Sequence, residues 1–301
     1  MVNGIENNFQ TYQGQEHEEE LGKNTYAFQW RDYDPAIARF NKIDRFAEKY
    51  ASINPYHFTS NNPIRFNEIK GDSLWINYKG NSILYQNGNL LNKDGTTYTG
   101  KGVKIKKDGT TKLKGFLKDA VDALNTISNA EGQTGTDVVS TLQSSENNFY
   151  IDSASNNPNG AGRNEFIADE RKKSYAIGMI AAGSGKYAEF GGSGGTVYWD
   201  PNGANLQELG GGTGNRPITN LAHEMFHAYD ANSGFSDNRP VLNGLKRNEW
   251  RASYYENQIR RQLNYPYREF YRSGGTNYRL LDNQDKPINV SPPSIIWING
   301  M

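Results

Sequence analysis

The chain has 301 residues and a formal net charge of zero, from 33 Lys and Arg residues against 33 Asp and Glu residues, and it has no cysteine. This balance argues against a protein built mainly to bind nucleic acid or an anionic membrane. Without cysteine there are no disulfides or thiolates, so imidazole and carboxylate groups would have to hold any transition metal. No apolar run approaches the roughly 18 residues that span a membrane, and the first residues lack the pattern of a Sec signal peptide.

Turn signals dominate the start of the chain, where Asp34-Pro35 and Asn54-Pro55 interrupt short aromatic segments. We therefore predict a small β-rich, turn-rich N-terminal region over residues 1–70. Hairpin signals such as Asn87-Gly88 follow, because asparagine and glycine accept the positive φ angles of tight turns. Residues 71–115 are thus expected to form β-hairpins.

The rest of the chain mixes helical and strand patterns. The spacing of apolar residues predicts helices over residues 114–127, 221–229 and 246–264, the second capped by Thr219 or Asn220. Short β-rich runs predict strands over residues 196–200, 278–281 and 295–298. The predicted fold class is α+β.

The strongest chemical signal is the run His223-Glu224-Met225-Phe226-His227. Residues four apart share one face of a helix, so both imidazoles reach a single ion. Glu224 lies near that ion and can take a proton from a metal-bound water, whose pKa zinc lowers to about 7. The alternative is a chance pattern on an amphipathic helix. Because Met225 and Phe226 supply an apolar face and a capping residue lies upstream, we predict a Zn²⁺ site.

A catalytic zinc usually has a third protein ligand. A third histidine six residues after His227 is excluded, because Ser233 occupies that position. We predict Glu249, at the start of the next helix, as the third metal ligand; the alternative is a surface glutamate that stabilises the helix N-terminus. Asp230 and Asp237 are further candidates, although Asp230 is better placed to orient His227.

Two short patterns support this assignment by resemblance. The helix start Asn248-Glu249-Trp250-Arg251-Ala252-Ser253 resembles the gluzincin pattern, in which the glutamate helix packs on the metal helix and completes the site. The run Arg268-Glu269-Phe270-Tyr271 resembles the Arg-x-x-Tyr of clostridial neurotoxin light chains, where both side chains face the scissile carbonyl. That resemblance implies catalytic roles for Arg268 and Tyr271 in oxyanion stabilisation; the alternative is a structural role for both.

Zincins also carry an edge strand upstream of the metal helix. Residues 196–200 are therefore either such an edge, open to an extended substrate, or an ordinary sheet strand.

A dense set of short sequence motifs lies between residues 12 and 70. It includes Asp32-Tyr33-Asp34-Pro35, Arg39-Phe40, Ala47-Glu48-Lys49-Tyr50, Asn54-Pro55-Tyr56 and Asn61-Asn62-Pro63-Ile64-Arg65-Phe66. This region resembles the RHS repeat-associated core of Rhs/YD-repeat polymorphic toxins. In that family the core precedes a variable toxin domain, so the resemblance implies that residues 71–301 are a toxin domain.

A second set of short sequence motifs follows in order from about residue 145 to 271. It comprises Val197-Tyr198-Trp199-Asp200-Pro201, His223-Glu224-Met225-Phe226-His227-Ala228, Asn248-Glu249 and Glu256-Asn257-Gln258-Ile259-Arg260. This segment resembles the effector zinc metallopeptidases of the NleD type. The resemblance implies a zincin-like fold with a catalytic core over residues 116–271 and a β tail over residues 272–301.

Together these patterns predict a secreted or cell-delivered zinc endopeptidase that hydrolyses proteins of a target cell, with Glu224 as general base. The expected partners are a protein substrate and a cognate immunity protein, with no nucleic acid and no membrane span. Two alternatives stay open: a non-enzymatic binding or adhesion module at the C-terminus of a YD-repeat surface protein, and a metal hydrolase acting on a non-peptide bond. The intact Glu224 speaks against the first.

Overall fold

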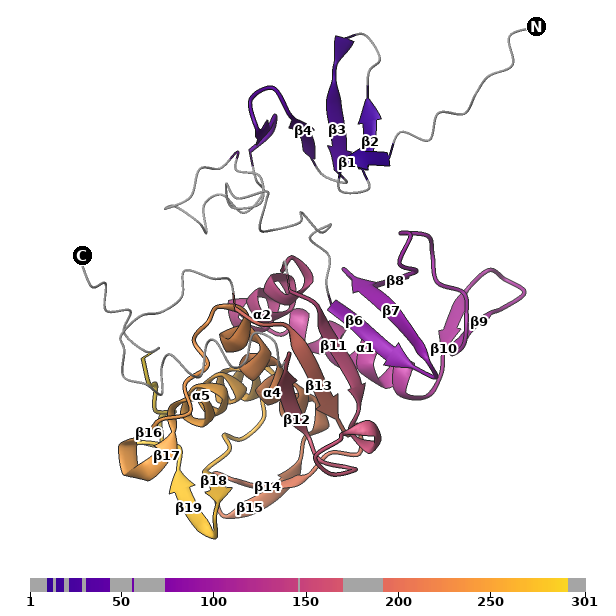
Figure 1. The fold of residues 1–301 in the computed structure, drawn as a ribbon. Coiled ribbons are helices and arrows are strands. Elements are labelled where there is room, and N and C mark those ends of the chain that lie inside the picture. The colour runs from indigo at the N-terminus through magenta and orange to yellow at the C-terminus, as the bar shows by residue number, and fades with distance from the viewer. Residues whose placement is uncertain are drawn as a thin grey trace, which may run out of the picture. The chain divides into compact units, whose positions relative to one another are not determined.

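The computed structural model describes residues 10–12, 15–18, 22–28, 31–43, 56, 74–145, 147–169 and 192–291. The chain forms two compact units, Met1–Gly71 and Asp72–Met301 (Figure 1).

The first unit contains a five-stranded antiparallel sheet whose strands follow one another in chain order. They are β1 (Gln10–Tyr12), β2 (Gln15–Glu18), β3 (Thr25–Phe28), β4 (Arg31–Asp34) and β5 (Arg39–Phe40). Tyr33 and Phe40 are buried, and Tyr26 packs against them. The described part of this unit is therefore β-structure, as the sequence predicted. The RHS-like sequence motifs over residues 47–66 lie outside the described residues, apart from Tyr56.

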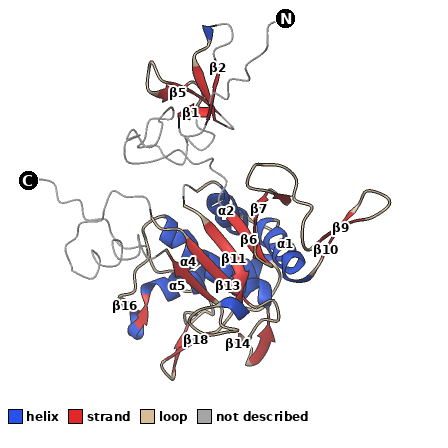
Figure 2. Ribbon diagram, turned by 45° about the vertical axis from the view of Figure 1, so that its right-hand side comes forward, coloured by secondary structure: helices blue, strands red, loops and turns tan. Residues whose placement is uncertain are grey.

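The second unit is built on a six-stranded sheet (Figure 2). In spatial order the strands are β12 (Glu165–Ala168), β13 (Gly195–Trp199), β11 (Phe149–Ser153), β6 (Leu74–Tyr78), β7 (Asn81–Gln86) and β8 (Asn89–Leu91). β11 runs parallel to both of its neighbours, and the other pairs are antiparallel. β6, β7 and β8, from the region predicted to form β-hairpins, therefore make up half of this sheet.

Tight turns join β6 to β7 and β7 to β8. Each has two successive central residues with positive φ, Lys79-Gly80 and Asn87-Gly88. Positive φ at both positions is the mark of a type I′ turn, whose twist matches that of the flanking strands. The hairpin predicted at Asn87-Gly88 is confirmed.

Four α-helices lie in the described part of the second unit. They are α1 (Gly115–Ser128), α2 (Gln133–Gln143), α4 (Pro217–Asn232) and α5 (Arg247–Gln262). α1 and α4 pack on the sheet, α2 contacts both, and α5 packs along α4. The core between helices and sheet includes Leu74, Ile76, Leu117, Leu124, Phe149, Val197, Leu221 and Met225. The predicted α+β class is confirmed, and none of the described helices has the length and apolar character needed to cross a membrane.

Short hairpins and single turns complete the unit. The hairpins are β9 (Val103–Ile105) with β10 (Thr111–Leu113), β14 (Asn205–Glu208) with β15 (Gly212–Asn215), β16 (Pro240–Val241) with β17 (Leu245–Lys246), and β18 (Phe270–Ser273) with β19 (Thr276–Arg279). The turns are η4 (Ala154–Asn156) and η5 (Leu242–Gly244). The strand predicted over residues 295–298 lies outside the described residues.

Two helical features differ from the predictions. α2 was not predicted, because its sequence is polar and contains Gly135; a Cβ there would lie 1.9 Å from the backbone oxygen of Ile127, so close packing on α1 requires glycine. α4 begins at Pro217, before the predicted caps, and the Thr219 hydroxyl donates to the backbone oxygen of Arg216. Neither Thr219 nor Asn220 therefore caps this helix.

Candidate metal centre and active site

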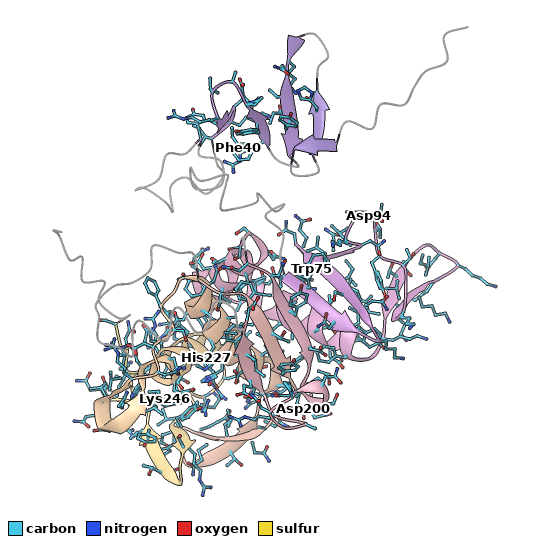
Figure 3. All side chains as sticks on the ribbon, viewed as in Figure 1. Phe40, Trp75, Asp94, Asp200, His227 and Lys246 are labelled. Carbon is cyan, nitrogen blue, oxygen red and sulfur yellow. The ribbon has the colours of Figure 1, made fainter. Side chains whose placement is uncertain are left out.

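Helix α4 brings His223 and His227 together in the interior of the second unit; Figure 3 labels His227. Met225 belongs to the core under the sheet, whereas Phe226 stacks on Tyr255 of α5 with ring centroids 4.3 Å apart. The helix is thus fixed on both sides. The one-turn spacing turns both imidazoles in the same direction, and their Nε2 atoms lie 3.2 Å apart.

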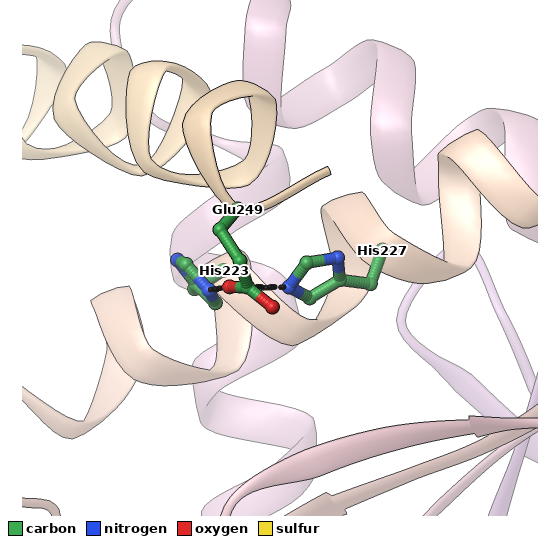
Figure 4. Close-up of side chains that lie close together, drawn as sticks. All are labelled: His223, His227 and Glu249. Carbon is green, nitrogen blue, oxygen red and sulfur yellow. Dashed lines mark hydrogen bonds and ion pairs between the residues drawn. The ribbon is translucent and has the colours of Figure 1, made fainter. Parts of the chain in front are cut away.

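Glu249, in the first turn of α5, directs its carboxylate at these two nitrogens (Figure 4). Its Oε2 lies 3.4 Å from Nε2 of His223 and 3.4 Å from Nε2 of His227. Within the described residues, this buried oxygen has no hydrogen-bond partner. A buried carboxylate oxygen without a hydrogen bond is costly unless a cation satisfies it.

The three atoms fit a tetrahedral zinc ion. Zinc bonds of about 2.0–2.2 Å place neighbouring ligand atoms about 3.3–3.6 Å apart, close to the observed 3.2 Å and 3.4 Å. Two histidines and a glutamate also form a known catalytic zinc ligand set, which leaves a fourth position for water or substrate. His223, His227 and Glu249 could therefore hold one metal ion together.

The charges around the imidazoles favour a cation at this point. Burial lowers the pKa of His223, but Glu249 and Glu256 outweigh it and raise that pKa to about 9. Burial lowers the pKa of His227 too, but the charge and hydrogen bond of Glu249, together with the charge of Glu224, outweigh it and raise that pKa. Burial raises the pKa of Glu249, but the two histidines hold it well below its usual value. The same negative charge favours a metal ion in place of the proton.

Glu224 is held from the side of the sheet. Its Oε2 accepts a hydrogen bond of 2.8 Å from the backbone N–H of Phe166 in β12. Burial raises the pKa of the Glu224 carboxyl, although the charges of His223 and His227 oppose the increase. A carboxylate with a raised pKa can take up a proton and return it near neutral pH. The position of Glu224 therefore suits a general base.

β12, and not the strand at residues 196–200, is the edge of the sheet. β13 lies between β12 and β11, so the reading of residues 196–200 as an edge strand is wrong and the ordinary sheet strand is correct. Phe166 is paired in register with Val197 of β13, yet its N–H bonds Glu224. The outward backbone groups of β12 thus face the side on which Glu224 lies.

On its other side, His223 meets a buried ion network formed by Glu256, Arg260 and Arg268. Nδ1 of His223 lies 3.1 Å from Oε2 of the fully buried Glu256. Arg268 donates to the same oxygen at 2.8 Å, and Arg260 donates to Oε1 at 2.9 Å. Burial raises the pKa of Glu256, but the charges of Arg268 and Arg260, together with His223, outweigh it and hold the pKa below its usual value. A proton on Nδ1 leaves the Nε2 lone pair to face Glu249.

Arg268 lies in this network and is only 8% exposed. Its Nε donates to the backbone oxygen of Phe270 at 3.1 Å, and its guanidinium lies 4.8 Å from the ring centroid of Tyr271. These contacts place the guanidinium at the Nδ1 side of His223, away from the group of ligand atoms. A direct role of Arg268 in oxyanion stabilisation stays a prediction.

Tyr271, in β18, lies beside His223, one of the three candidate metal ligands. Its ring stacks on that of His223, with centroids 6.0 Å apart and planes 19° from parallel. Burial, together with the charge and hydrogen bond of Glu249, raises the pKa of the hydroxyl. The hydroxyl therefore keeps its proton as a donor. Trp250 and Tyr278 belong to the apolar cluster that fixes this strand.

The two alternative ligands are bound elsewhere. Asp230 accepts hydrogen bonds of 2.6 Å and 2.8 Å from Arg251, so the prediction that it orients His227 is wrong. Asp237 is fully buried and paired with two arginines. Neither carboxylate joins the group of ligand atoms.

Sequence reasoning missed the contacts of Glu256 with His223 and of Phe166 with Glu224. Glu256 follows Glu249 by two helical turns, so the two share a face of α5; this spacing could have indicated the first contact. The second is made by a backbone N–H, for which side-chain identity carries no signal.

The α+β fold brings a histidine–histidine–glutamate group beside Glu224, and the comparison with known families identifies a peptidase domain. The Peptidase M91 family, described as effector protein, matches residues 101–252, half of the chain. The protein therefore belongs to the Peptidase M91 family of effector proteins, which supports an effector metallopeptidase domain. The matched segment contains His223, Glu224, His227 and Glu249, and it ends before Glu256. No curated protein matches the chain.

Proposed function

We propose that this protein is a zinc-dependent endopeptidase that acts as an effector on proteins of a target cell. The observation that carries the proposal is the convergence of Nε2 of His223, Nε2 of His227 and the unpaired Oε2 of Glu249. Membership of a peptidase family supports the peptide bond as the bond that is cut.

The residues divide the chemistry between them. His223, His227 and Glu249 would hold the zinc ion, which when bound would polarise a carbonyl and lower the pKa of a water molecule. Glu224 takes a proton from the attacking water on Oε1, because Oε2 is held by the N–H of Phe166. The same carboxyl then gives that proton to the amine that leaves.

Tyr271 is the proposed donor to the carbonyl oxygen as negative charge develops there. Its raised pKa keeps the hydroxyl protonated, and its stacking on His223 holds it beside the ligands. Arg268, predicted to act directly, supports this arrangement through its contacts with Glu256 and the Tyr271 ring. An extended substrate would pair with the outer side of β12 and so bring its backbone to Glu224.

We further propose that residues 1–70 are a remnant of an RHS repeat-associated core and that residues 71–301 are a toxin domain delivered into the target cell. Three observations support this division into core and toxin: the RHS-like sequence motifs, the boundary between the two compact units at Gly71, and the effector family. Such a toxin would require an immunity protein in the cell that makes it.

Metal analysis combined with one variant tests the proposal. Purified protein should take up one zinc per chain; iron is measured in parallel, because two histidines and a carboxylate also hold iron in some enzymes. Glu224→Gln should keep the zinc and lose proteolysis, followed as new protein N-termini in target-cell extract. Loss of zinc together with activity would show that Glu224 is misassigned, and wild-type protein that takes up no zinc would contradict the metal site.

A further inference from the structure

The hairpin β14–β15 is joined to a metal-ligand candidate by a chain of buried charges. Glu208, the last residue of β14, is 7% exposed and accepts hydrogen bonds from Arg260 at 2.8 Å and from Arg216 at 3.2 Å. Arg260 also binds Glu256 at 2.9 Å, and Glu256 meets Nδ1 of His223 at 3.1 Å. Two residues thus stand between the hairpin and the imidazole.

We propose that Glu208 is a positioning residue for the imidazole of His223 and that it acts through Arg260 and Glu256. The inference rests on the proposed metal site, because it concerns how one ligand of that site is held. It assigns a role to a hairpin that contributes no ligand itself.

The physical reason lies in the buried charge of Arg260. This side chain is fully buried, and a guanidinium cannot lose its proton in a protein. With Glu208 in place, two carboxylates share its charge, and Oε2 of Glu256 stays with His223. Without Glu208, Glu256 would be the remaining carboxylate on Arg260, and the need to compensate a buried charge would draw it away from Nδ1.

The backbone fixes Glu208 for this role. The hydrogen bonds on either side of it, from Leu209 N to Tyr267 O and from Glu269 N to Gln207 O, are both 2.9 Å long and tie β14 to the segment that leads into β18. The carboxylate therefore has a defined position relative to α5.

The facing strand β15 offers a matched pair of glycines. A Cβ at Gly214 would lie 2.3 Å from the carboxylate atoms of Glu208, whereas a Cβ at Gly212 would meet nothing within 4 Å. Gly214→Ala therefore displaces the carboxylate without changing any charge. Gly212→Ala adds the same methyl group on the same strand and leaves the carboxylate in place.

A salt bridge that serves stability alone would not change how the metal is held, so the readouts are metal affinity and metal geometry. Zinc affinity of the full chain is measured by competition with a chelating dye, and geometry by the visible absorption spectrum of the Co²⁺-loaded protein. The variants are Glu208→Gln and Gly214→Ala, with Gly212→Ala and Asp230→Asn as controls. Thermal unfolding of each metal-free protein reports its fold.

Glu208→Gln and Gly214→Ala should each lower the zinc affinity about 3- to 10-fold and alter the Co²⁺ spectrum. The loss is smaller than the roughly 10- to 100-fold typical of a group bonded directly to a ligand, because two residues intervene. Gly212→Ala should match the wild type in every readout. Asp230→Asn should unfold at a lower temperature but keep the wild-type affinity and spectrum.

Wild-type affinity and an unchanged spectrum in both Glu208→Gln and Gly214→Ala would overturn the inference while the metal site stands. A Gly214→Ala protein that is unfolded before metal is added would also overturn it, because the contact would then serve folding alone. A wild type that binds neither zinc nor cobalt would refute the proposed function, and this inference with it.

Discussion

The interface between α4 and α5 carries buried charges at two places, and the two differ in how the carboxylate is satisfied. Asp230 of α4 meets Arg251 of α5 through two hydrogen bonds of 2.6 Å and 2.8 Å. Further along the same interface, Oε2 of Glu249 faces the Nε2 atoms of His223 and His227 at 3.4 Å, without a hydrogen bond from any described residue.

The difference separates a structural ion pair from a candidate ligand site. At Asp230 each carboxylate oxygen has its donor, so the pair is complete and has nothing left to offer a metal. At Glu249 two imidazole nitrogens and one carboxylate oxygen converge, and the oxygen has no hydrogen-bond partner among the described residues, an arrangement that a cation completes. Burial and charge alone therefore do not mark a candidate ligand; here the missing donor at Oε2 of Glu249, together with the two facing imidazoles, does.

The largest expected effect is at the ion pair of Asp230 and Arg251. Asp230→Asn leaves Arg251 buried with a weakened partner, and removing one partner of a buried ion pair costs about 3–5 kcal/mol. We expect the free energy of unfolding of the metal-free protein, measured in urea, to fall by about this amount. Zinc affinity should stay at the wild-type value; a loss approaching that of Glu249→Gln would end the distinction between the two places.

The next effect is at Glu249, where a substitution should change zinc affinity more than the stability of the metal-free protein. Glu249→Gln removes a charged ligand, so zinc affinity measured by chelator competition should fall at least about 100-fold, beyond the range usual for groups outside the first shell. Stability of the metal-free protein should change less than in Asp230→Asn, because Oε2 of Glu249 makes no hydrogen bond there. Undiminished zinc affinity would remove Glu249 from the site.

The pH dependence of zinc binding sharpens the comparison further. Because Glu249 and Glu256 raise the pKa of His223 to about 9, the metal-free site holds a proton at neutral pH that zinc must displace. Displacement of this proton makes the zinc affinity fall at least about tenfold for each unit that the pH drops between roughly 9 and 6, and the raised pKa of His227 steepens the fall at the lower end. Competition titrations at pH 6, 7 and 8 measure this slope, and a flat profile would count against it.

The smallest effect concerns the sheet side of the site. Phe166→Pro removes the N–H that holds Glu224, on an edge strand where proline is tolerated. The loss of one hydrogen bond, about 1 kcal/mol, should lower kcat about fivefold with zinc affinity unchanged. Phe166→Leu keeps the N–H and serves as control; equal losses in both would assign the effect to the ring instead.

The parts of the site that were predictable are those set by local periodicity. His223 and His227 share a face because a helix repeats every 3.6 residues, and the same rule links Glu249 to Glu256. The contact of Glu224 with the backbone of Phe166 depends on which strand lies at the edge of the sheet. The local sequence of residues 196–200 did not predict their place in the strand order, because that order depends on tertiary contacts.

The same division holds for the fold. The hairpin at Asn87-Gly88 and the helices of residues 114–127 and 246–264 follow from turn chemistry and apolar spacing, and the structure contains them. α2 depends instead on Gly135 lying against Ile127, a tertiary contact that overrides weak helix propensity. The charge chain from Glu208 joins a hairpin to two helices, so no single segment of sequence reveals it.

The most direct test of the central claim is the position of the metal. Crystals of the zinc-loaded protein, measured on both sides of the zinc absorption edge, should give one anomalous peak bonded to Nε2 of His223, Nε2 of His227 and a carboxylate oxygen of Glu249. A peak that omits Glu249 would contradict the account, as would no peak in that position from protein crystallised with zinc.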